Sequence, residues 1–117
     1  MLWDVIYNKL KSEGIEVYTP GQHKGDCTTN YVVVRPSGTN QFMEYSTDVM
    51  YCDVMCYVPL EHFSQLKTFV DRVKGILKKL YPQVKDAHME VPGFIDDSNK
   101  SHMWSIQYQS YRQFFNL

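Results

Sequence analysis

The sequence lacks the features that mark a secreted or membrane-spanning protein. No hydrophobic run approaches the roughly 20 residues that a membrane-spanning helix needs. A signal peptide would need an apolar core near the start, but charged side chains such as Asp4 and Lys9 interrupt residues 1–12. We therefore expect a protein that is cytoplasmic at synthesis, whatever particle it later joins.

Patterns for disulfides and metals are also missing. The three cysteines, Cys27, Cys52 and Cys56, are an odd number without a CxxC spacing, so neither a disulfide framework nor a zinc ribbon is expected. On one strand, Cys52 and Cys56 would lie about 13 Å apart at 3.3 Å per residue, too far for a disulfide. Asp96 and Asp97 resemble the start of a calcium loop, but the glycine and late glutamate of that pattern are absent. We predict no metal and a reducing compartment.

Positive charge is not concentrated anywhere. The net charge is −1 and the pI is near 6.4, with lysine and arginine scattered along the chain. The densest basic cluster, Lys74, Lys78 and Lys79, falls on the polar side of a predicted helix, where a solvated face is the usual explanation. Specific nucleic-acid binding is therefore not expected.

Catalytic motifs are absent too. The sequence has no glycine-rich phosphate loop, no GxSxG elbow and no HExxH helix. Only His23, Lys24, Asp26 and Cys27 gather catalytic residue types in one place, and the same segment is equally typical of a polar loop. We expect neither an enzyme nor a cofactor.

Aromatic side chains, in contrast, are plentiful. They make up 15% of the sequence, and nine of them are tyrosines. Tyrosine favours surfaces that are partly buried and partly wet, so this composition suggests a protein interface.

The hydrophobic pattern predicts a single α+β domain spanning residues 1–117. Its mainly antiparallel, four-stranded sheet should carry an N-terminal helix and one long helix on one face. In chain order we predict a helix at 2–13, a short extended piece at 15–18, a loop at 19–30, strands at 31–35 and 49–58, a long helix from 59 to 80, a strand with a bend at 84–95, a polar turn at 96–100 and a last strand at 101–112.

Alternation along the strands assigns their two faces. From Met50 to Val58 the even-numbered residues are all apolar and should face the long helix, including its Phe63. The opposite face mixes aromatic, sulfur-containing and polar residues, where a solvated face would be richer in Lys, Glu and Thr. It forms our candidate subunit interface: Tyr31, Val33, Arg35, Tyr51, Asp53, Met55, Tyr57 and Met103.

A plainer explanation of that face stays open. Tyrosine and valine favour extended backbone and can occupy an exposed strand for that reason alone. A register error of one residue would also exchange the two faces.

Several segments together resemble a known family. The segments LWDVIYNKLKSEG, YVVVR, DVMYCDVMCYVP, EHFSQLKTFVDRVKGILKKL and HMWSIQYQSYR, in this order, resemble the tail-terminator, tail-completion and minor capsid proteins of long-tailed bacteriophages and prophages. The resemblance implies a virion structural protein that forms a homo-oligomeric ring, commonly a hexamer, on the end of the tail tube. There it would stop tube growth and contact the head-connector protein. It would lie in the host cytoplasm during assembly and then at the head-proximal end of the tail.

The resemblance carries no catalytic residue, and it corresponds only by region. Two segments are expected to project toward neighbouring subunits or the tube: the 19–30 loop, with Gln22, His23, Lys24 and Asp26, and the connection at 38–48. The alternatives are a head-completion or connector protein, a generic protein-binding module and, last, an enzyme.

Overall fold

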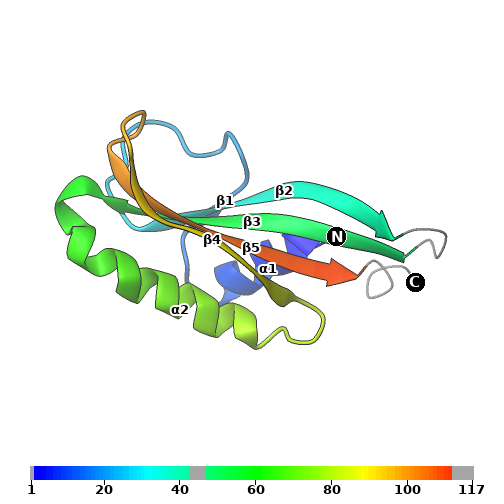
Figure 1. Ribbon diagram of the computed structural model, residues 1–117. Helices are drawn as coiled ribbons and strands as arrows, with labels where there is room; N and C mark the ends of the chain where they lie inside the picture. The colour runs from blue at the N-terminus through cyan, green and yellow to red at the C-terminus, as the bar shows by residue number, and fades with distance from the viewer. Residues whose placement is uncertain (1, 43–46, 112–117) are drawn as a thin grey trace.

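The computed structural model describes residues 2–42 and 47–111 and, outside 38–48, their side chains. Its elements are α1 (Leu2–Ser12), β1 (Val17–Tyr18), β2 (Tyr31–Phe42), β3 (Thr47–Pro59), the 3₁₀ helix η2 (Leu60–Gln65), α2 (Leu66–Lys78), β4 (Lys85–Asp96) and β5 (Ser101–Tyr111). Figure 1 shows a long curved sheet with α1 and α2 on the same side of it. The predicted α+β fold is confirmed.

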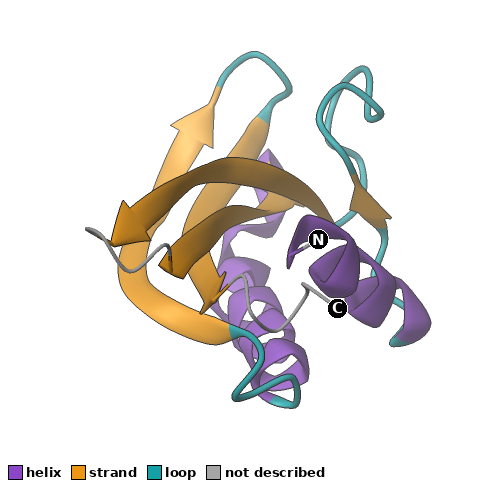
Figure 2. Ribbon diagram, turned by 90° about the vertical axis from the view of Figure 1, so that its right-hand side faces the viewer, coloured by secondary structure: helices purple, strands orange, loops and turns teal. Residues whose placement is uncertain are grey.

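The sheet has five strands in the order β1-β2-β3-β5-β4. β1 pairs in parallel with β2, and every other pairing is antiparallel. The fifth strand is the short extended piece predicted at 15–18, which becomes a strand by pairing Val17 with Val32 and Tyr18 with Val33. The end-on view in Figure 2 shows how strongly the sheet curls around the helices.

The core lies between the helices and one face of the sheet, as the alternation predicted. Val54 and Val58 on β3 and Ile106 on β5 have no exposed surface. The helices supply the other half of the core with Leu2, Ile6, Leu10, Leu66, Phe69, Val70, Val73, Ile76 and Leu77. Because α1 and α2 both bury an apolar stripe here, neither is available to cover the other face of the sheet.

The predicted long helix is interrupted near its start. Residues 60–65 form the 3₁₀ turn η2, within which His62 has non-helical backbone angles of φ −112° and ψ 32°. A 3₁₀ turn has three residues per turn, so the stripe set by α-helical spacing does not extend through it. Phe63, predicted to lie in the core, is therefore 61% exposed.

The first hairpin is longer than predicted. β2 continues past Pro36, with a register shift between Pro36 and Gly38, and then pairs with β3 as far as Phe42 opposite Thr47. The irregularity accommodates a proline, which has no N–H to donate to the ladder. Most of the 38–48 connection, expected to project as a loop, is therefore paired strand, and 43–46 lie outside the described residues.

β4 is an edge strand with two irregularities in its pairing with β5, between Asp86 and Met89 and between Val91 and Phe94. The second coincides with the predicted bend at Pro92-Gly93. A Cβ atom on Gly93 would lie 3.1 Å from Cδ2 of Leu66, so the backbone approaches the start of α2 closely here. The last strand begins at Ser101, as predicted, while Arg112 lies outside the described residues.

Candidate functional site

The face of the sheet opposite the helices, here called the outer face, contains the predicted interface residues. Three zones make it up: an end covered by the 19–30 loop, a hollow beside that loop, and an exposed row on β4. The three zones differ in exposure and in polarity.

The covered end is built around Tyr31. Its ring is 1% exposed and is stacked between His23 at 4.0 Å and Tyr57 at 4.9 Å, measured between ring centroids. The edge of Tyr18 meets it at 5.6 Å, and its hydroxyl accepts a hydrogen bond from Asn99 Nδ2 at 2.8 Å. Burial raises the pKa of this hydroxyl, so it stays protonated. Tyr31 is thus a core residue of a second, smaller cluster.

The 19–30 loop is tied to the turn between β4 and β5. The backbone N–H of Cys27 donates to the carbonyl oxygen of Asn99 at 2.7 Å, and Asp26 forms an ion pair with Lys100 at 3.6 Å. Figure 1 shows this loop and the β4–β5 turn side by side at one end of the sheet. The loop therefore lies over the end of the outer face instead of projecting freely.

This arrangement corrects part of the predicted interface. Tyr31, Tyr57 and Met103 are 1%, 8% and 9% exposed, because the loop and their own cluster cover them. They offer no surface to a partner in this structure. His23, predicted to project, is stacked on Tyr31 instead. Its predicted companions Gln22, Lys24 and Asp26 are exposed on the loop.

Beside the loop, the sheet forms a hollow of about 450 Å³ that brings together predicted residues from both regions. Val33, Arg35 and Met55 line its floor, and His23 lines its loop side. Arg35 forms an ion pair with Asp53 at 2.6 Å across β2 and β3. Tyr51, also on β3, is half-buried. The middle of the outer face is thus more polar than a continuous apolar interface would be.

The most exposed apolar residues of the outer face lie on β4 and were not predicted. Met89, Val91 and Phe94 are 64%, 52% and 43% exposed. Their partners on β5, Gln107, Ser105 and Met103, belong to the outer face, so the three form one row, here called the β4 row. The pairing irregularity between Val91 and Phe94 breaks the two-residue alternation of the strand. The alternation pattern therefore did not place these residues on one face. The apolar content of the strand predicted at 84–95 was the available signal.

A second exposed apolar group lies on the opposite face, at the same end as the loop. Leu60, Phe63 and Ile95 are 37%, 61% and 55% exposed. His102 links them, because its ring Nε2 lies 3.1 Å from the carbonyl oxygen of Leu60, its centroid lies 4.8 Å from that of Phe63, and it pairs with Ile95. We call Leu60, Phe63 and Ile95 the tip cluster.

The geometry of the loop disfavours thiolate chemistry. Burial raises the pKa of Cys27 to about 11, and its Sγ donates to the carbonyl oxygen of Thr29 at 3.3 Å. The imidazole of His23 is stacked on Tyr31. Nucleophilic cysteines instead have a lowered pKa and a base in contact.

Comparison with known proteins adds no family: no protein-family model matches the chain, and no curated protein matches it. Within residues 2–42 and 47–111, no helix is long and apolar enough to cross a membrane.

Proposed function

We propose that this protein is a virion assembly protein of the tail-terminator type, which forms a ring on the end of a tail tube and joins it to the head. The observation that carries the proposal is the pair of exposed apolar patches, the β4 row and the tip cluster, on opposite faces of the sheet. The order of the elements in the resembling family supports it as well.

A ring needs two different patches on each subunit, because each copy contacts one neighbour with one surface and the next neighbour with another. The β4 row lies on the outer face, and the tip cluster lies on the helix face. In the proposed ring, the β4 row of one copy packs against the tip cluster of the next. Contiguous exposed apolar groups of this kind mark interaction sites more often than scattered single residues do.

A partner is expected to bind β4 through its side chains, not by adding a strand to the edge of the sheet. β4 has a free edge, but Pro92 and the two pairing irregularities interrupt the regular row of backbone donors that another strand would need. A partner would therefore recognise the Met89, Val91 and Phe94 side chains.

Each contact should be weak by itself. Burying the exposed parts of six apolar side chains gives about 6 kcal/mol, at roughly 1 kcal/mol for half of a full side-chain burial. Association costs of about 4–15 kcal/mol offset most of this. Closure of the ring would make up the difference by holding several contacts at once.

The proposal is tested by removing the gene from the phage or prophage that carries it and measuring tail lengths by electron microscopy. A missing terminator should give tails longer than the wild-type length. Tails of normal length that are not attached to heads would contradict the terminator role and favour a head-completion protein. Normal particles would contradict both roles and favour a generic binding module.

A further inference from the structure

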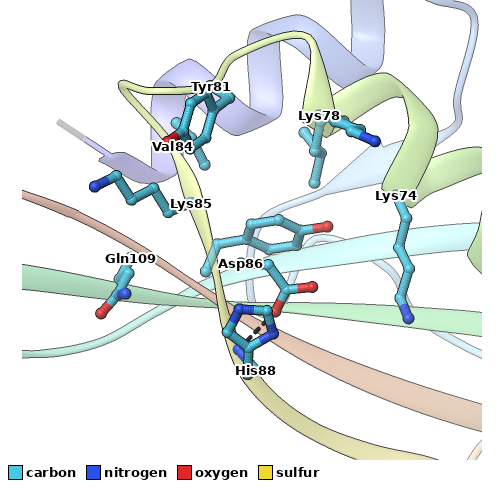
Figure 3. Close-up of a pocket in the computed structure, with 10 residues that line it drawn as sticks. Lys74, Lys78, Tyr81, Val84, Lys85, Asp86, His88 and Gln109 are labelled. Carbon is cyan, nitrogen blue, oxygen red and sulfur yellow. Dashed lines mark hydrogen bonds between the residues drawn. The ribbon is translucent and has the colours of Figure 1, made fainter.

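A separate pocket lies on the helix side of the molecule, far along the chain from the 19–30 loop. It is enclosed by the second half of α2, the turn after it and the start of β4, and its volume is about 510 Å³ (Figure 3). Pockets of this size hold small organic ligands.

The inner wall of the pocket is apolar. Leu77 and Tyr108, which are 0% and 4% exposed, and Val84 at 2% belong to the main core and also line the pocket. Tyr81 adds an aromatic ring at the mouth, where it is 67% exposed. An apolar body of moderate size would therefore displace water from apolar surface on entering.

The rim carries more positive than negative charge. Lys74 and Lys78 come from α2 and Lys85 from β4 (Figure 3). Lys74 is neutralised by Glu90 at 2.9 Å. Within the part of the chain that the structure describes, no carboxylate forms an ion pair with Lys78 or Lys85. Two ammonium groups at the mouth therefore have no ion-pair partner among the described residues.

Asp86 adds one negative charge to the rim, so the three lysines outnumber Asp86 and Glu90 by a single charge. Asp86 accepts a hydrogen bond from the backbone N–H of His88 at 2.7 Å, and Figure 3 shows this contact on the side of the pocket formed by β4. Lys85 lies 5.9 Å from the ring centroid of Tyr81, a contact that leaves its donors free for an anion.

The wall also contributes a hydroxyl group, that of Tyr108. Among the described residues, no group forms a hydrogen bond with the Tyr108 hydroxyl, although this side chain is 4% exposed. Burial raises the pKa of that hydroxyl, so it remains a hydrogen-bond donor. No described side-chain nitrogen or oxygen atom is both buried and without a hydrogen-bond partner, so this hydroxyl is open to the pocket, where a ligand can accept its hydrogen bond.

We propose that this pocket binds a small organic anion, in which an apolar ring or short chain carries one carboxylate. The apolar body would lie against Leu77 and Val84, and the carboxylate would accept hydrogen bonds from Lys78, Lys85 and the Tyr108 hydroxyl. The site is independent of the β4 row and the tip cluster, so it holds or fails apart from the assembly role.

The test uses the full chain and two probes of equal shape, 2-naphthoate and its uncharged counterpart 2-naphthamide. A two-dimensional NMR titration measures the affinity of each probe and the chemical-shift changes that it causes. The carboxylate should bind about tenfold more tightly than the amide, because charge-assisted hydrogen bonds are the stronger ones. The largest shifts should fall on the amides of Leu77, Val84 and Tyr108.

Variants assign the contacts. Lys78→Gln and Lys85→Gln should each weaken naphthoate binding about three- to tenfold, and Tyr108→Phe about fivefold, with naphthamide affected less by the lysine changes. Lys24→Gln removes the same charge from the 19–30 loop and is the matched control, for which unchanged affinity is expected. Because no described residue forms a hydrogen bond with the Tyr108 hydroxyl, Tyr108→Phe should fold normally.

Three results would overturn the proposal. Equal binding of both probes, or no effect of the two lysine variants, would rule out recognition of the anion. Shifts centred on the β4 row would place binding elsewhere.

Discussion

Replacement of Tyr31 separates a core role from an interface role for this residue. If its ring is buried under the 19–30 loop, Tyr31→Ala should destabilise the isolated chain. If it were instead exposed to a partner, the same change would leave the stability of the chain nearly unaltered and impair only assembly.

The magnitude follows from the contacts of Tyr31. Truncating a buried aromatic ring to alanine costs about 3–5 kcal/mol. That figure includes the stacking on His23 and Tyr57, since such aromatic pairs contribute about 0.5–1.5 kcal/mol each. Tyr31→Phe keeps the ring and removes only the acceptor of the Asn99 hydrogen bond, so it should cost about 1 kcal/mol.

Urea denaturation followed by circular dichroism measures both changes. With a slope of about 2 kcal/mol per M, the midpoint should fall by about 0.5 M for Tyr31→Phe and by about 2 M for Tyr31→Ala. Phe63→Ala is the control, because it removes an aromatic ring that is 61% exposed and should cost less than about 1 kcal/mol. A Tyr31→Ala variant that is no less stable than the Phe63→Ala control would refute the burial of Tyr31 under the 19–30 loop.

Two further predictions concern titration and reactivity. The hydrogen bond from Lys74 lowers the pKa of Glu90, so this carboxylate stabilises the fold above its ordinary pKa and loses that contribution as the pH falls through the lowered value. Glu90→Gln should cost about 0.5 kcal/mol at pH 7 and almost nothing near pH 3, and an equal difference in stability at both pH values would contradict the ion pair. Burial raises the pKa of Cys27 to about 11 and those of Cys52 and Cys56 to about 12. Alkylation by iodoacetamide, followed by mass spectrometry at pH 8, should therefore be slow at all three, with Cys27 reacting first through opening of the loop; rapid modification of Cys52 in the folded chain would disprove its burial.

The fold was largely predictable because its main elements are encoded locally. The even-numbered apolar residues from Met50 to Val58 identify the buried face of β3 by alternation alone. The spacing of Leu66, Val70 and Leu77 likewise identifies the buried stripe of α2. Neither signal depends on distant residues, so the sequence was sufficient for both.

The outer face was harder to predict because tertiary contacts determine it. The 19–30 loop has no apolar period, and it covers Tyr31 because Cys27 and Asp26 contact Asn99 and Lys100 some 70 residues later in the sequence. No local pattern reports such a tether. The β4 row was obscured for a different reason, since each pairing irregularity changes which alternate residues share a face.

The most direct test of head-to-tail assembly is to mix two defective variants. Val91→Lys places a charge in the β4 row, and Phe63→Lys places one in the tip cluster, so each variant keeps one intact patch. Sedimentation equilibrium at up to about 1 mM, the range that weak contacts require, measures the resulting species.

Wild-type protein should associate into species larger than dimers, and each variant alone should remain monomeric. The equimolar mixture should form a one-to-one dimer and nothing larger, because the tip cluster of the Val91→Lys chain can pack against the β4 row of the Phe63→Lys chain only once. Wild-type protein that stays monomeric throughout this range, or a mixture that stays monomeric while wild type assembles, would contradict a ring built from these two patches.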